Sequence, residues 1–204
     1  MAPTPDTVLA ALPRVVRVAD ETRWRGQAAL GTAIVLAIFW SLTWLLGEPV
    51  ERVRTPVGFM AVAAPTLLVA GLASRRRVAN TLAVALPTPR GVVHETVAHA
   101  RDRRMRLATV VLFGIILLLV FDRFTGGGGM MAGLVAGLML ATGIVDLLES
   151  RLWRHEERTR AVRLFVLVRP RALTPALSPE DVFQAPDSGS GGPIEMPLDA
   201  GDLP

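Results

Sequence analysis

Four long apolar stretches dominate this sequence, over about 26–47, 56–74, 105–121 and 130–148. An α-helix rises about 1.5 Å per residue, so about 20 apolar residues cross the ~30 Å hydrocarbon core of a bilayer. Backbone polar groups in lipid need partners within the span, which favours helices. With a mean hydropathy of +0.43, the sequence therefore predicts an all-α, polytopic membrane protein with four transmembrane helices in two hairpins.

The third stretch is the shortest of the predicted spans. Its uninterrupted apolar part, residues 107–121, needs Met105 and the aliphatic stem of Arg106 to reach across a bilayer. A form with three spans, in which this stretch is re-entrant, is the alternative. In the second stretch, Pro65 is expected to kink the helix.

The segments that precede and connect the hairpins are polar and basic. Residues 1–25 are predicted to form an amphipathic N-terminal segment on the cytoplasmic side. Residues 74–106 form a linker with eight arginines, and the run Leu86-Pro87-Thr88-Pro89 divides it. Because proline ends helices, we expect this linker to be a cytoplasmic helical hairpin with one arm on each side of the break.

The chain after the fourth stretch changes character twice. Residues 149–171 are basic, with an arginine-rich helical part followed by a β-prone run at 164–168. Residues 172–204 hold six acidic side chains and no basic one, among many Pro, Ser and Gly residues. This composition is typical of a disordered acidic tail.

The distribution of arginines predicts the orientation. The N-terminal segment, the linker and the C-terminal segment hold 4, 8 and 7 arginines, whereas the two turns at the other side hold 2 and 1. An excess of basic residues marks the cytoplasmic side of a membrane protein. We therefore expect a multi-pass protein of a bacterial inner (cytoplasmic) membrane with both termini in the cytoplasm.

The same arginines are candidate contacts for partners. Near an anionic lipid surface each arginine contributes about 1 kcal/mol of attraction. We expect the anionic headgroups of the bilayer and an acidic protein partner to bind here, and we do not expect nucleic acid. The candidate contacts are Arg75, Arg76, Arg77, Arg101, Arg103, Arg104 and Arg106.

The fourth stretch carries two further candidates. Gly133 and Gly137 form a G-x-x-x-G pattern, continued by Ala141, which favours close approach of a second helix. That helix belongs either to this chain or to a second copy, and tethering favours this chain. Asp146 lies near the cytoplasmic end of the stretch, where an arginine can form a buried ion pair with it; a proton-relay site is the alternative.

Motifs for chemistry are sparse. His94 and His99 flank Glu95, but their i,i+5 spacing sets the rings roughly 140° apart on a helix, and the zinc motif needs i,i+4. Cysteine is absent, which excludes disulfides and thiolate ligands. We therefore expect no catalytic residue, no cofactor and no metal.

These observations predict a role rather than a reaction. We expect a non-catalytic membrane anchor, assembly factor or accessory subunit that engages a cytoplasmic partner or anionic lipid. The alternative is a small oligomeric transporter or channel subunit. Pro65, the Gly133/Gly137 pair and the short third stretch favour that alternative.

Overall fold

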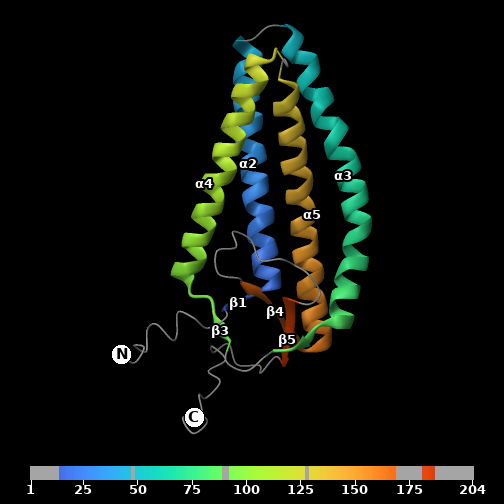
Figure 1. Ribbon diagram of the computed structural model, residues 1–204. Helices are drawn as coiled ribbons and strands as arrows, with labels where there is room; N and C mark the ends of the chain where they lie inside the picture. The colour runs from blue at the N-terminus through green and yellow to red at the C-terminus, as the bar shows by residue number, and fades with distance from the viewer. Residues whose placement is uncertain (1–13, 47–48, 89–91, 127–128, 169–180, 187–204) are drawn as a thin grey trace, which may run out of the picture.

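A computed structural model describes residues 14–46, 49–88, 92–126, 129–168 and 181–186. Within these residues the protein is mostly helical, with 80% helix in four helices. They lie side by side, alternately up and down, with a sheet at one end (Figure 1). The helices are α2 (Val18–Leu46), α3 (Pro49–Val84), α4 (Val97–Phe124) and α5 (Met130–Arg160).

Three of the described helices are long and apolar enough to cross a membrane. They are the segments Arg54–Val84, Val97–Phe124 and Met130–Arg160. They include the second, third and fourth predicted stretches, so the multi-pass membrane class is supported. α4 is one continuous helix of 28 residues, longer than the third stretch suggested. α3 likewise continues through Pro65.

α5 is the central helix, and α3 packs along its length. A Cβ atom added at Gly137 would lie 2.5 Å from the carbonyl oxygen of Phe59, and one at Gly133 would overlap the carbonyl oxygen of Thr55. Real side chains do not tolerate such contacts, so the backbones of α3 and α5 touch. Small residues permit this approach between membrane helices.

α2 packs against the half of α5 nearer the sheet. There a Cβ atom at Gly26 would lie 2.9 Å from the carbonyl oxygen of Gly143. α4 differs, because it diverges from α2 as the two helices approach the sheet (Figure 1). Most of its large apolar side chains are exposed, among them Val110, Leu112, Phe113, Ile116, Leu117, Val120 and Phe121.

A five-stranded sheet covers one end of the helices, in the order β2-β5-β4-β1-β3. β4 lies at its centre and is antiparallel to both β1 and β5. The edge strands β2 and β3 run parallel to β5 and β1. The strands are β1 (Arg14–Arg17), β2 (Leu86–Pro87), β3 (Val93–His94), β4 (Val162–Val168) and β5 (Val182–Pro186).

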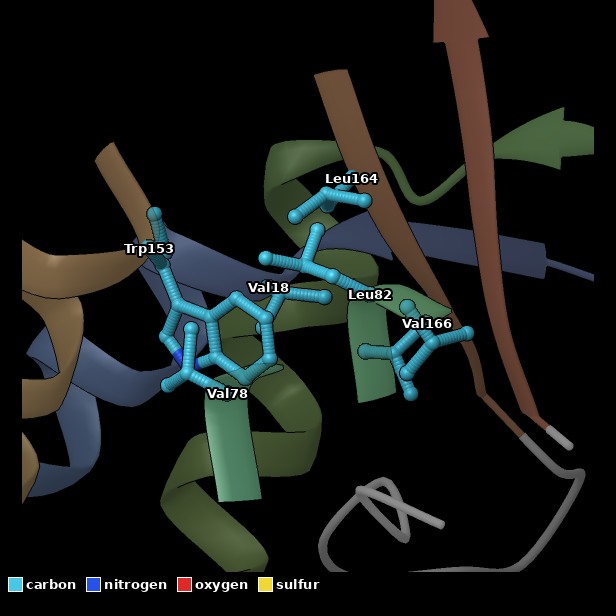
Figure 2. Packing of buried hydrophobic residues seen from close by; sticks show 8 residues of the cluster. Val18, Val78, Leu82, Trp153, Leu164 and Val166 are labelled. Carbon is cyan, nitrogen blue, oxygen red and sulfur yellow. The ribbon is translucent and has the colours of Figure 1, made fainter. Parts of the chain in front are cut away.

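The hydrophobic core lies between this sheet and the bases of α2, α3 and α5 (Figure 2). Successive residues of a strand point to opposite faces, so Leu164 and Val166 of β4 face the helices while Phe165 packs on the other face. Trp153 of α5 is 1% exposed and fills the centre of the core. Its other members are Val18, Ala19, Val78, Leu82 and Val182.

The sheet shows that an all-α class was too narrow. The β-prone run at 164–168 lies within β4, but the other strands were not predicted. Arg14–Arg17 is a strand and not part of an amphipathic helix. The segment 182–186, predicted to be disordered, pairs with β4 through Val182 to Pro186. Residues 1–13 and the tail residues 172–180 and 187–204 lie outside the described residues.

The linker is also not a simple helical hairpin. Its first arm is the end of α3, which reaches Val84, but β2 and β3 follow before α4 begins at Val97. Thr96 caps α4 by accepting a hydrogen bond from the backbone N of His99 at 3.4 Å. The part of the second arm before Val97 is not helical, because Leu86–Pro87 pairs with β5 and Val93–His94 with β1; the part from Val97 to Arg106 is helical and belongs to α4.

Candidate functional site: an ion-pair collar at the sheet end

Charged side chains gather where the helix bases meet the sheet. We call this set of ion pairs between α2, α3, α4, α5 and the strands the ion-pair collar. Several of its carboxylates are buried, so each needs its arginine partner. The pairs are Arg17–Glu157, Arg25–Asp146, Arg77–Glu149, Arg103–Glu21, Arg103–Glu95, Arg104–Glu21 and Arg154–Asp20.

Arg103 is the most buried cation of the collar, with 3% exposure. Its Nη1 and Nη2 donate to the two carboxylate oxygens of Glu21 at 2.7 and 2.9 Å. Its Nε and Nη2 donate to Glu95 at 3.1 and 3.0 Å. The planar guanidinium suits this double bidentate geometry. Arg103 therefore attaches the base of α4 to the base of α2.

Arg104 adds a second cation to the same carboxylate. Its Nη2 lies 3.4 Å from Glu21, and its guanidinium carbon lies 4.9 Å from the ring centroid of Trp24. A cation above an indole face is attracted by the ring quadrupole. Both contacts attach α4 to the first turns of α2.

The carboxylate of Glu157 joins α5 to two strands. It accepts from Arg17 of β1 at 2.6 Å and from the backbone N of Leu164 in β4 at 3.0 Å. The side chain is 3% exposed. This one group therefore fixes the central part of the sheet against the last turns of α5.

Two more carboxylates of α5 face the other helices. Glu149 is buried, and its Oε1 lies 3.1 Å from Nη1 of Arg77 in α3. Asp146 lies 3.7 Å from Nε of Arg25 in α2. The predicted candidate for a buried ion pair thus lies beside Arg25, which was predicted to belong to the N-terminal segment and lies in α2.

The predicted arginine contacts fall into two groups. Arg77, Arg103 and Arg104 take part in the collar. The others are exposed and form no ion pair with any described residue; they are Arg75, Arg76, Arg101 and Arg106. Only this second group is open to lipid or to a partner, and we call it the free arginines.

The residues predicted to pack against a second helix contact a helix of the same chain. Gly133 and Gly137 face α3, and Ala141 is fully buried. At this contact Gly133 and Gly137 are covered by the backbone of Thr55 and Phe59 in α3.

A buried carboxylate, that of Asp122, lies at the end of the bundle opposite the sheet, and it was not predicted from the sequence. Asp122, near the end of α4, is 4% exposed and accepts from the backbone N of Gly129 at 3.0 Å and of Met131 at 3.5 Å. It thereby satisfies free amides at the start of α5. An acid eight residues before the start of α5 was the only signal in the sequence.

The two histidines beside Glu95 serve separate local contacts. His94 lies edge-on to Phe165, with ring centroids 5.0 Å apart, and Nδ1 of His99 lies 2.7 Å from the Thr96 hydroxyl. No group of three or more side chains that could hold a metal ion occurs among the described residues. No family model, curated protein or solved structure matches this chain. Its function is therefore inferred from the geometry of the collar and the bundle.

Proposed function

We propose that α2 is a fourth membrane span. β1 leads directly into α2 and β2 follows α3, and both strands belong to the same sheet. A chain that crosses the membrane along α3 toward this sheet has to cross away from it along α2. Gly26 of α2, packed on Gly143 of α5, supports the same depth for both helices.

The sheet end is the cytoplasmic end in this proposal. The three arginine-rich segments, residues 1–25, 74–106 and 149–171, each contribute at least one strand to it. Basic residues are enriched on the cytoplasmic side of membrane proteins. The inner membrane of a bacterium is the location that suits this pattern.

The role that this arrangement supports best is a non-catalytic membrane anchor or accessory subunit. The observation that carries it is the convergence of the N-terminal, central and C-terminal basic segments into one sheet, joined to the helices by the buried pairs of Arg103 and Glu157. Such an end is a rigid platform. The free arginines would hold it against anionic headgroups, at about 1 kcal/mol each, and present it to a cytoplasmic partner.

The partner is tested with the full chain, extracted in gentle detergent from its own host. We expect a stable heterocomplex by mass measurement, which the double variant Arg75→Glu, Arg76→Glu weakens at least severalfold. The matched control is Arg123→Glu, an exposed arginine at the opposite end of the bundle. A complex that survives the double variant, or solute flux through liposomes holding only this protein, would overturn the proposal.

Orientation is tested with single cysteines, since the chain has none of its own. A membrane-impermeant maleimide should label Thr125→Cys in intact cells and Arg76→Cys only after permeabilisation. The reverse pattern would show that the protein has the opposite orientation. Labelling of both sites in intact cells would show that the chain does not cross the membrane along α4.

A second candidate function is an oligomeric transporter or channel subunit. The observation that favours it is α4, whose apolar side chains face away from the other helices. A closed homo-oligomer with α4 at its interface would support this candidate over the first.

A further inference from the structure

A hollow lies in the half of the bundle farther from the sheet, between α2 and α3 where both approach α5. Its volume is about 400 Å³, within the ~300–1,000 Å³ of ordinary ligand pockets. It is separate from the ion-pair collar. Its walls come from all three helices and include Ala37 and Trp40 of α2, Thr55 and Pro56 of α3, and Gly133 and Ala136 of α5.

Small side chains create this hollow, and rigid contacts keep it open. Ala33 and Ala37 on α2 face Ala132 and Ala136 on α5 across it. α3 cannot move closer to α5, because Gly133 already touches the Thr55 backbone. The space is therefore a fixed feature of the packing.

The walls are almost entirely hydrocarbon, which decides what can fill the space. Water finds no partners in an apolar cavity, and an empty one forfeits the dispersion contacts of its lining. The α3 and α5 walls belong to segments that are apolar enough to cross a membrane. At that depth, the surrounding medium consists of lipid acyl chains.

A cation lies at the rim of the hollow. Arg54 directly precedes Thr55 and Pro56 of the wall and is exposed. Its Nη1 donates to the carbonyl oxygen of Gly126 at 3.3 Å, which holds the guanidinium at the end of the bundle. The remaining N–H groups of the fork suit a phosphate oxygen. We propose that the hollow binds one acyl chain of an anionic phospholipid, with the headgroup phosphate on Arg54.

Trp40 in the wall provides the readout. The full chain, with Trp24, Trp44 and Trp153 replaced by Phe, is reconstituted in phosphatidylcholine vesicles and titrated with phosphatidylglycerol that carries bromine on its acyl chains. Bromine quenches indole fluorescence on contact. We expect saturable quenching of Trp40, stronger than with brominated phosphatidylcholine at the same mole fraction.

Two variants separate the chain site from the headgroup site. Ala136→Phe fills the hollow and should abolish the saturable part of the quenching, whereas Ala108→Phe on the exposed face of α4 should not. Arg54→Gln should lower the apparent affinity for phosphatidylglycerol by about fivefold, the equivalent of about 1 kcal/mol for one arginine at a charged surface. Arg158→Gln, an exposed arginine of α5 near the sheet that is not one of the free arginines, is the matched control and should leave the affinity unchanged.

Three results would overturn the proposal. Quenching that Ala136→Phe leaves unchanged would place the chain elsewhere. Equal affinity for the two lipids, or no effect of Arg54→Gln, would show that Arg54 does not bind an anionic headgroup. A cross-link from Ala37→Cys to a second copy of this chain or to another protein would show that a helix, and not lipid, occupies the hollow. Because the partner complex depends on the opposite end, this proposal and the anchor function fail independently.

Discussion

α4 and α5 are both long apolar helices, but α5 is packed against other helices and α4 is mostly exposed. Both are apolar enough to cross a membrane, and α4 is the more apolar of the two, yet 28% of the apolar window of α5 is buried and only 6% of that of α4. The glycines explain the difference. Gly133, Gly137 and Gly143 of α5 touch neighbouring helices, whereas a Cβ at Gly114 of α4 would meet nothing within 4 Å. High hydropathy makes a helix suitable for a membrane, and small residues determine which helices pack closely against it.

The consequence is that α5 is held along its length and α4 mainly at its ends. Arg103 attaches the base of α4 to Glu21, and Asp122 near its other end caps the start of α5. Three substitutions test this contrast, each measured as the free energy of unfolding in mixed micelles of dodecyl maltoside and dodecyl sulfate.

The largest effect is expected from Arg103→Met. It leaves Glu21 and Glu95 buried without their main cation, and breaking a buried pair costs about 3–5 kcal/mol. Arg101→Met, an exposed arginine of the same helix, should stay within about 0.5 kcal/mol of the parent. Spin labels on α2 and α4 should also show the bases of the two helices moving apart. Equal stabilities for the two variants would mean that α4 is not held at its base.

Gly133→Leu should have the second largest effect. The side chain would collide with the Thr55 backbone, and overpacking typically costs about 1–3 kcal/mol. Gly114→Leu introduces the same side chain on α4, where space is open, and should leave the stability unchanged or slightly higher. If Gly114→Leu proved as damaging as Gly133→Leu, α4 would have a close neighbour that the fold does not provide.

Asp122→Ala should have the smallest effect of the three. It removes the acceptor for the amides of Gly129 and Met131, and loss of a helix cap costs about 1 kcal/mol. Asp102→Ala, an exposed acid at the other end of α4, is the control and should be nearly neutral. A loss well above that of Gly133→Leu would show that the end of α4 matters more than the packing of α5.

Several parts of this fold were predictable because their signals are local. A run of apolar residues identifies a candidate span wherever it lies, and α3, α4 and α5 follow such runs. The arginine-rich character of the three segments that contribute β1, β2, β3 and β4 is also a local property. An acid within reach of an arginine, such as Asp146, could be singled out for the same reason.

The sheet and most of the collar depend on partners far apart in the chain, so no local pattern marks them. Val15 pairs with Leu167, and Leu86 with Phe183. Two-residue strands such as β2 and β3 are too short to show an alternating pattern. Glu21 and Glu157 looked like ordinary surface acids until Arg103 and Arg17 were placed beside them. β5 was not predicted, because its few apolar residues lie in a segment whose acidic composition is typical of disorder.

The order of strands in the sheet sets a schedule for biogenesis. β1 is synthesised before the four described helices, but its neighbour β4 follows the last of them. The edge of β1 that pairs with β4 therefore stays unpaired until the ribosome has delivered α2, α3, α4 and α5. Contacts of such long sequence separation form late and slowly. A chain that stops before residue 162 therefore leaves β1 without its antiparallel neighbour, and the sheet loses its central strand.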